Sequence, residues 1–295
     1  MAPLLNISIS NNLQFFHVFI LILILILFPC PSAATTSEAE ALLNWKNSLH
    51  NPTTHSLLSS WNLLPSYNST SPSTKSSRRS CCKRIGIVCN VFGSVTEINL
   101  TSKNLKGAIP VSIGNLSSLT FLVLEENKIF GTIPEELGQL SSLNMLYLQA
   151  NHLSGLIPSS IRNLSKLSSL GSIPKEVGQL SSLMVLYLYE NHLSGSIPSS
   201  IGNLNKLFDL ELSTNNITGF IPEEVGQLSS LMVLYLYENH LSGTIPSSIG
   251  NLSNLSDLEL TTNNITGSIP KEVGQLSSLN RLYLHKTISV VQSLH

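Results

Sequence analysis

Residues 231–254 read LMVLYLYENHLSGTIPSSIGNLSN, and units of the same kind follow one another from Val95 onward. Each unit opens with a leucine, and successive openings lie 24 residues apart except for one interval of 16. Self-similarity at a fixed period of this length is typical of repeat proteins, whose stacked units share one apolar core. The opening leucines are Leu119, Leu143, Leu167, Leu183, Leu207, Leu231, Leu255 and Leu279.

The unit contains a short strand followed by a turn. Leu234 and Leu236 alternate with other residues at period two, which predicts a strand with one buried face. Strands of successive units should pair in parallel about 4.8 Å apart and bury their leucines against one another. Asn239 follows, and its amide can donate to and accept from backbone groups that the turn leaves unpaired. Gly243 permits torsions that other residues avoid, and Pro246 suits an irregular outer segment. The equivalent asparagines are Asn127, Asn151, Asn191, Asn215 and Asn263.

The second half of the unit carries a more specific pattern. Residues 131–140 (GTIPEELGQL) and 195–204 (GSIPSSIGNL) resemble the plant-specific extracellular class of leucine-rich repeat, and the resemblance covers residues 37–286. It implies an α/β solenoid: a right-handed superhelix with short parallel strands on the concave face, a 3₁₀ or irregular convex side and a helical, disulfide-containing N-terminal cap. It further implies the ectodomain of a plant receptor-like kinase or receptor-like protein.

The cap is expected over residues 35–94. Ser37 to Glu40 is similar to a capping box that opens a helix, and Leu42, Trp45 and Leu49 would form the apolar stripe of that helix. Leu57, Leu58 and Trp61 add a second apolar cluster. Residues 62–80 are rich in Ser and Thr and are expected to form a flexible loop.

Three cysteines lie in the cap, so one of them stays single or pairs between chains. The spacing from Cys82 to Cys89 fits a short covalent loop. Residues 81–89 (CCKRIGIVC) are similar to the cap signature of the family, with Arg84 in the place of its usual tryptophan. The first cap cysteine of the family has no counterpart downstream of residue 34, which leaves Cys81 as the expected free thiol.

The beginning of the chain has the pattern of a signal peptide. The apolar run 18–28 is too short for a confident membrane span, and the small residues Ser32 to Ala34 follow it. We expect a signal peptide over residues 1–34 with cleavage after Ala34, although the segment before the run holds no Lys or Arg, and an uncleaved anchor is the alternative. The mature chain would then lie in the apoplast or on the outer face of the plasma membrane.

Composition and motifs exclude several function classes. The chain has 16 Lys and Arg against 17 Asp and Glu, which argues against a nucleic-acid binder that neutralises phosphates. It carries no glycine-rich phosphate loop or nucleophile elbow. His152, His192 and His240 follow the asparagine in alternate units, and two strand spacings of about 10 Å would keep them from sharing a metal. We therefore expect no enzyme, no metal and no cofactor.

Binding is expected at the strand positions that the scaffold leaves free. Tyrosine offers a large amphipathic contact area, and the acids give the face a negative potential. The sequence predicts an extended peptide or protein ligand of basic character, with a co-receptor carrying similar repeats as a further partner. The predicted contact residues are Phe121, Glu125, Tyr147, Tyr187, Tyr189, Glu190, Asp209, Glu211, Tyr235, Tyr237, Glu238, Asp257 and Glu259.

Glycans are expected at eight Asn-x-Ser/Thr sequons downstream of residue 34, since such sequons mark accessible surface in a secreted chain. These are Asn68, Asn99, Asn115, Asn163, Asn216, Asn251, Asn254 and Asn264.

Two places depart from the regular pattern within residues 95–286. The unit at 167–182 is short by eight residues, so we expect a kink, bulge or unpaired stretch near 167–175 and the lowest stability there; a sequence-assembly error is the alternative. The last unit is incomplete, and residues 287–295 leave the pattern. An apolar edge left open there should favour aggregation or pairing unless the tail covers it.

These features predict a non-catalytic extracellular recognition module. An inhibitor of cell-wall enzymes, similar to polygalacturonase-inhibiting proteins, is one alternative, because those proteins use the same repeats and cap. A truncated duplicate without activity is another, and it would explain the short unit and the abrupt end. The identity of residues 179–195 with 227–243 indicates internal duplication.

Overall fold

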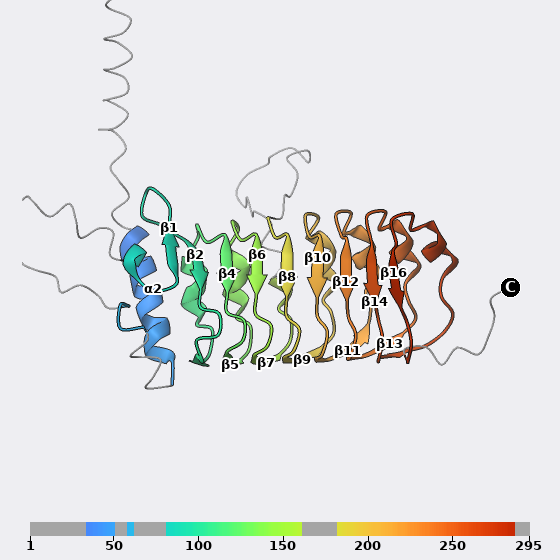
Figure 1. Cartoon of the computed structure of the whole chain (residues 1–295), viewed down its shortest axis with the longest axis horizontal. Helices are drawn as coiled ribbons and strands as arrows, with labels where there is room; N and C mark the ends of the chain where they lie inside the picture. Colours follow the sequence, from blue (N-terminus) through green and yellow to red (C-terminus); the bar gives the residue numbers. More distant parts are fainter. Residues whose placement is uncertain (1–33, 51–57, 62–80, 161–181, 287–295) are drawn as a thin grey trace, which may run out of the picture.

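The computed structural model describes residues 34–50, 58–61, 81–160 and 182–286. In these residues the chain winds into a solenoid whose coils stack side by side along one axis, with the helix α2 at one end (Figure 1). The solenoid and its N-terminal cap agree with the predicted fold class.

Each coil contributes one strand to a nine-stranded sheet that lines the concave face. The strands follow chain order, and every neighbouring pair is parallel except β1 and β2. The strands are β1 (Ile87–Cys89), β2 (Val95–Asn99), β4 (Phe121–Val123), β6 (Met145–Tyr147), β8 (Val185–Tyr187), β10 (Asp209–Glu211), β12 (Val233–Tyr235), β14 (Asp257–Glu259) and β16 (Arg281–Tyr283).

The leucines of successive coils form one continuous core. Leu122, Leu146, Leu186 and Leu234 occupy the central strand position in four coils, and each is at most 1% exposed. Because an isolated coil has no interior of its own, every coil relies on its neighbours to exclude water. The prediction of a shared apolar spine is confirmed.

The asparagine at the end of each strand joins neighbouring coils. The Asn239 side chain donates to the carbonyls of Leu212, Leu236 and Tyr237 at 3.0–3.2 Å, and its oxygen accepts from the Ile217 backbone N–H at 3.0 Å. It therefore satisfies four backbone groups of two coils, as the sequence predicted. The residue before it, Glu238, has a φ of 53°, an uncommon left-handed conformation for a residue with a side chain.

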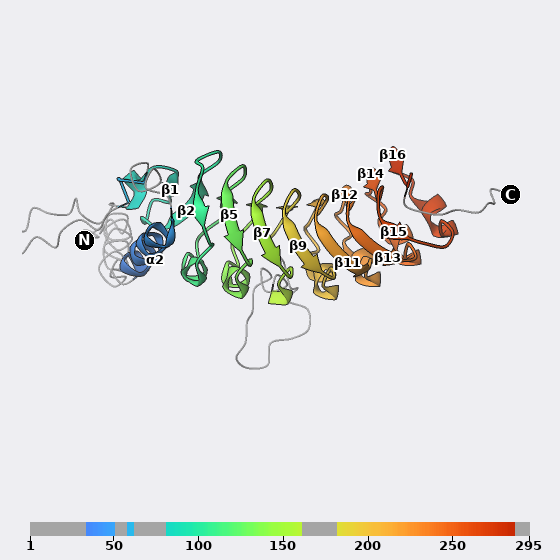
Figure 2. The ribbon, with the colours of Figure 1, turned by 90° about the horizontal axis from the view of Figure 1, so that it is seen from below.

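A second sheet runs along the side of the array, where the sequence predicted only irregular structure. Figure 2 shows several of its strands crossing the array between the inner sheet and the outer side. It forms because the residues after each asparagine continue in an extended conformation and pair with the same segment of the next coil. Its strands are β3 (Lys106–Gly107), β5 (Lys128–Gly131), β7 (His152–Gly155), β9 (His192–Gly195), β11 (Asn216–Phe220), β13 (His240–Gly243) and β15 (Asn264–Ile265).

Short 3₁₀ helices form the outer side of the coils. Each follows a proline such as Pro246, whose φ of −67° and missing N–H suit the position before a helical turn. The helices are η3 (Val111–Asn115), η4 (Glu135–Gln139), η6 (Ser199–Asn203), η7 (Glu223–Gln227), η8 (Ser247–Asn251) and η9 (Lys271–Gln275).

The cap covers the first coil with helix α2 (Ala34–Ser48). The helix begins ahead of Ser37, so the predicted capping box there is wrong; no Pro or Gly between Ala34 and Ser37 stops the helix earlier. Leu42, Trp45 and Leu49 are buried as predicted, and the Trp45 ring meets Trp61 edge-on at 6.1 Å. Leu58 is buried in the same cluster, whereas Leu57 lies outside the described residues.

Arg84 lies inside the cap at 3% exposure. Its Nη1 donates to the Ala39 carbonyl of α2 at 3.4 Å, so the residue that replaces the family's tryptophan still joins the helix to the cysteine segment. The Glu38 carboxylate accepts from the Val95 backbone N–H at 3.2 Å, and burial raises the pKa of this acid. These two polar residues tie α2 to the rest of the cap.

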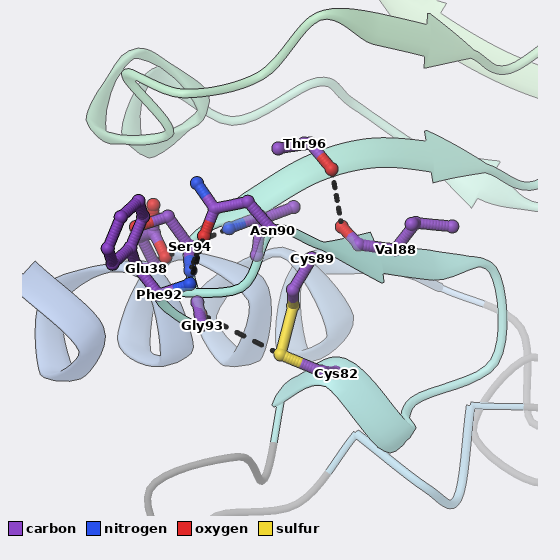
Figure 3. Close-up of a disulfide and its surroundings, with 10 residues drawn as sticks. Glu38, Cys82, Val88, Cys89, Asn90, Phe92, Gly93, Ser94 and Thr96 are labelled. Atoms are coloured by element: carbon purple, nitrogen blue, oxygen red, sulfur yellow. Dashed lines mark hydrogen bonds between the residues drawn. A yellow bond between two sulfur atoms is a disulfide. The ribbon is translucent and has the colours of Figure 1, made fainter.

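A disulfide closes the cap between the short 3₁₀ helix η2 (Cys81–Lys83) and strand β1. It joins Cys82 and Cys89 with a Cα–Cα distance of 5.4 Å, as the spacing predicted (Figure 3). Beside it, the Asn90 side chain accepts from the backbone N–H groups of Phe92 and Ser94 and thereby fixes the turn from β1 to β2. The side chain of Cys81, the expected free thiol, lies outside what the structure describes.

The short unit does not add a strand to the inner sheet. Strand β6 pairs directly with β8, so that Met145 lies opposite Val185, 40 residues further along the chain, whereas the other parallel steps take 24. The asparagine ladder continues across this step, because Asn191 donates to the Leu148 carbonyl at 3.0 Å. The coils on either side are therefore stacked in register, while the kink predicted near 167–175 lies outside the described residues.

At the other end of the array, strand β16 pairs only with β14 among the described residues. Leu282 is 38% exposed there, although the equivalent leucine of every other parallel strand is buried. The predicted signal peptide up to residue 33, the loop 62–80 and the tail 287–295 lie outside the described residues.

Candidate functional site

The inner face of the nine-stranded sheet carries the predicted contact residues in rows that run along the array. Because the parallel strands pair without offset, equivalent residues of successive coils lie beside one another. The first row is Phe121, Met145, Val185, Asp209, Val233, Asp257 and Arg281, and the second is Val123, Tyr147, Tyr187, Glu211, Tyr235, Glu259 and Tyr283. Glu125, Tyr189, Glu190, Tyr237 and Glu238 follow in the turns directly after the strands.

Tyrosines dominate the middle of this face. The rings of Tyr147 and Tyr187 meet edge-on at 5.0 Å although 40 residues separate them, because β6 and β8 are neighbours. Tyr187 and Tyr189 lie 6.0 Å apart, and Tyr235 and Tyr237 lie 6.3 Å apart. The four tyrosines of β8, β12 and their turns therefore flank the strand between them, β10.

Strand β10 carries two carboxylates, Asp209 and Glu211. The Tyr187 hydroxyl donates to Asp209 Oδ2 at 2.6 Å, while Asp209 Oδ1 is buried without a hydrogen-bond partner among the described residues. Burial raises the pKa of Asp209, and burial together with the nearby charge of Asp209 raises the pKa of Glu211 to about 7. Burial and the bond to Asp209 also raise the pKa of Tyr187. We name Asp209 and Glu211 the β10 acid pair.

The equivalent acids of β14, Asp257 and Glu259, have a different environment. Asp257 is only 5% exposed, because the Arg281 side chain from β16 forms an ion pair with it and Ser256 donates to it as well. Burial acts to raise the pKa of Asp257, but the bonds from Ser256 and Arg281 and the charge of Arg281 lower it overall. Asp257 was predicted to face a ligand; the structure shows it already paired within the chain.

The remaining predicted contacts divide by exposure. Glu190 and Glu238 are exposed and sit at the rim of the face, each with a left-handed backbone. Glu125 bonds to Gln149 and Thr101 of the neighbouring coils and is therefore held in place. Sequence reasoning missed these side-chain bonds between coils and the Arg281 ion pair; charge complementarity one repeat length apart was the signal that could have found them.

The predicted glycosylation sites within the described residues are all exposed. Asn115 and Asn251 end 3₁₀ helices on the outer side, and Asn216 and Asn264 begin strands of the second sheet. Asn99 ends β2 on the inner sheet, where its side chain accepts from Thr101. Asn254 is exposed as well. Asn68 and Asn163 lie outside the described residues.

The histidines are closer together than predicted. His152 and His192 stack with ring centroids 5.8 Å apart and an interplanar angle of 9°, because the direct pairing of β7 with β9 makes them neighbours. The argument that their separation excludes a shared metal is therefore wrong for this pair. Across the residues that the structure describes, no group of three or more His, Cys, Asp or Glu side chains is arranged to hold a metal ion.

None of the helices in the described segments is both long and apolar enough to cross a bilayer.

Comparison with known families matches the repeats. Two family models described as leucine rich repeat match residues 93–153 and 229–287, and residues 182–204 and 206–228, which together make up more than half of the chain.

Known receptors of Arabidopsis show the same repeats. The chain is 38% identical over 84 residues to the leucine-rich repeat receptor protein kinase EMS1 of Arabidopsis thaliana, a match that covers 28% of this chain and 6% of EMS1. It resembles the crystal structure of the Arabidopsis receptor kinase HAESA in complex with the peptide hormone IDA and the co-receptor SERK1, with a TM-score of 0.62 and 30% identity over 84% of this chain and 41% of that one. The PEPR1–AtPEP1 crystal structure gives a TM-score of 0.59 and 31% identity over 83% of this chain and 38% of that one.

Proposed function

Because the chain belongs to the plant extracellular leucine-rich repeat family, we propose that it is a non-catalytic recognition module that binds an extended, basic peptide or protein segment on its inner face. Two similar structures support a ligand of this kind: HAESA is described in complex with a peptide hormone and a co-receptor, and PEPR1 together with AtPEP1. The chain spans less than half of either structure, so the proposal concerns only the part of a receptor that these coils represent.

The charge and chemistry of the inner face carry the proposal. The scaffold needs the leucines, the asparagines and the glycines, but nothing in the stacking requires two acids between four tyrosines on β8, β10 and β12. Acids on such a face attract a cationic partner, and aromatic side chains supply contact area at a low entropic cost. The face is long enough for an extended segment to cross several coils.

Two further parts of the proposal follow from the family. A second receptor with similar repeats is the expected protein partner, as SERK1 is for HAESA. The chain would act outside the cell, in the apoplast or at the outer face of the plasma membrane, which agrees with the predicted glycan sites lying on exposed residues.

An array of synthetic twelve-residue peptides tests the proposal. Peptides of matched length and apolar content would carry none, two or four arginines, and binding of the purified chain should increase with arginine content. Reversing Glu190, Asp209, Glu211 and Glu238 to lysine should remove that binding. A matched control reverses Glu40, Glu135, Glu223 and Glu224, which lie away from the inner face, and should retain it. Equal binding by both variants would overturn the proposal.

A further inference from the structure

Two strands of the inner sheet carry the same acid pair on either side of one tyrosine strand. Residues 209–212 and 257–260 both read DLEL, and β12 with its Tyr235 lies between them. The local sequence is identical, so any difference between the two sites comes from the next strand along. The chain therefore contains its own comparison.

At β14, that next strand supplies a cation. Arg281 of β16 lies in register opposite Asp257, and the guanidinium bonds to the Asp257 carboxylate. The acid becomes buried and satisfied, and its pKa falls below the ordinary value. This arrangement shows which chemical group the DLEL strand accepts and from which position.

At β10, the corresponding position holds Val233, and the neighbour on the other side is Val185. No cation faces Asp209 from either strand. One oxygen of Asp209 accepts from the Tyr187 hydroxyl, and the other is buried with no hydrogen-bond partner among the described residues. An acceptor that is removed from water without a partner costs about 1–3 kcal/mol, so a donor supplied from outside would be favoured here.

We propose that the β10 acid pair, Asp209 and Glu211, is the subsite for one arginine side chain of the ligand. This inference rests on the proposed function and specifies it. The guanidinium would bond to Asp209 and Glu211 as that of Arg281 bonds to Asp257. Its plane would lie between the rings of Tyr187 and Tyr235.

Arginine fits this subsite better than lysine. Its planar fork presents several donors, which suits two carboxylates on alternate residues of one strand, and its flat face stacks on aromatic rings. A lysine ammonium is a compact charge that would satisfy one carboxylate at a time. Arg281 already demonstrates the fit within this chain.

The probes are N-acetyl-arginine amide, the equivalent lysine amide and the equivalent citrulline amide, which has the shape of arginine without its charge. Binding to the full chain is followed by NMR of ring-labelled tyrosines. The arginine probe should shift the tyrosine signals, bind at least about tenfold more tightly than the citrulline probe and bind more tightly than the lysine probe. Equal binding of the arginine and lysine probes would refute an arginine subsite, and so would equal binding of arginine and citrulline.

Variants locate the site. Asp209→Asn should weaken the arginine probe about tenfold, whereas Asp257→Asn should leave it unchanged. Val233→Arg places a cation where Arg281 stands relative to β14, and it should abolish probe binding while the melting temperature is maintained or rises. Arg281→Ala frees the second DLEL strand, and it should add a second equivalent of bound arginine. Unchanged probe binding in both Asp209→Asn and Val233→Arg would refute the proposal.

The outcomes separate this inference from the proposed function. If basic peptides bind the array and the four-fold charge reversal removes them, but Asp209→Asn and Val233→Arg have no effect, the recognition function stands and the arginine subsite is wrong. If the probe follows the predicted pattern but no peptide binds, the subsite stands and peptide recognition is wrong.

Discussion

At the scale of single residues, the repeated asparagine does the most to connect the coils. Asn215 is 6% exposed; its side chain donates to the carbonyls of Leu188, Leu212 and Ser213 at 3.0–3.1 Å and accepts from the Leu193 N–H at 3.0 Å. No backbone turn of this shape could satisfy these groups by itself. The side chain thus replaces hydrogen bonds that regular secondary structure would supply.

We expect Asn215→Ala to lower the free energy of unfolding by roughly 3 kcal/mol, because several buried backbone groups lose their partner at once. Chemical denaturation followed by circular dichroism measures the loss. Asn216→Ala is the matched control: the next residue is exposed, and its replacement in deglycosylated protein should change stability very little. Similar losses in the two variants would show that the ladder bonds contribute little.

Glu211 links pH to stability. Its pKa in the folded protein is about 7, against an ordinary value of 4.5, because burial and the neighbouring Asp209 disfavour its charge. The facing side chains are Tyr187 and Tyr189 of the β8 coil and Tyr235 and Tyr237 of the β12 coil. A raised acid pKa means that the contribution of this group to stability is fully present below pH 4.5 and is lost as pH rises through 7.

Glu211→Gln should therefore raise the melting temperature at pH 8 and leave it unchanged at pH 4. The gain at pH 8 should be about 1 kcal/mol, after allowance for the solvent that still reaches this carboxylate. Thermal melts of both proteins across pH 4 to 8 measure the difference. Glu259→Gln, the same change on β14, reports any effect of the amide alone. A difference that does not vary with pH would contradict the assignment to Glu211 ionisation.

At the scale of elements, the glycine at the end of each second-sheet strand has two separate constraints. Gly243 and Gly131 both have a positive φ, 75° and 82°. A Cβ on Gly243 would lie 2.3 Å from Phe220 Cδ1, whereas a Cβ on Gly131 would meet its nearest atom, Ala108 Cβ, at 3.7 Å. One site thus combines backbone strain with a clash, and the other has backbone strain alone.

Gly131→Ala should cost roughly 1 kcal/mol through its backbone conformation, and Gly243→Ala should cost clearly more. Adding Phe220→Ser, the residue type at the same slot in other coils, should return Gly243→Ala to the cost of Gly131→Ala. Equilibrium denaturation of the three variants provides the comparison. If Phe220→Ser restores nothing, the clash is relieved by movement of the ring and the backbone term accounts for the whole loss.

The elements also show where sequence reasoning succeeds and where it ends. The leucine, asparagine and glycine positions follow from the period, because each depends on the path of its own coil and of the next. The second sheet escaped prediction, since segments such as His192–Gly195 lack a strong alternation and gain their strand form from pairing with equal neighbours. The pairs Asp257–Arg281 and Tyr187–Asp209 also escaped it, although their register is regular, because a strand pattern indicates direction and not bonding partners.

At the scale of the whole molecule, the sheet passes the irregular unit without interruption. Strands β6 and β8 pair in register, the Leu148 N–H donates to the Tyr187 carbonyl at 2.9 Å, and His152 stacks on His192. The 40 residues from Met145 to Val185 thus make one step of the sheet, which elsewhere takes 24. Deleting residues 167–182 would join residue 166 to Leu183 and give a regular 24-residue unit.

We expect this deletion to leave the array folded and to increase the free energy of unfolding by about 0.5 kcal/mol or less, because a shorter connection loses less entropy on closure. Thermal melts and probe binding at the β10 acid pair, which lies beyond the deletion, would measure it. The matched control deletes residues 191–206, also 16 residues, and removes Asn191, β9 and η6; it should unfold the neighbouring coils, since each depends on direct contact with the next. A loss of stability in the first deletion as large as in the second would mean that the contact between β6 and β8 does not by itself hold the two halves of the array together.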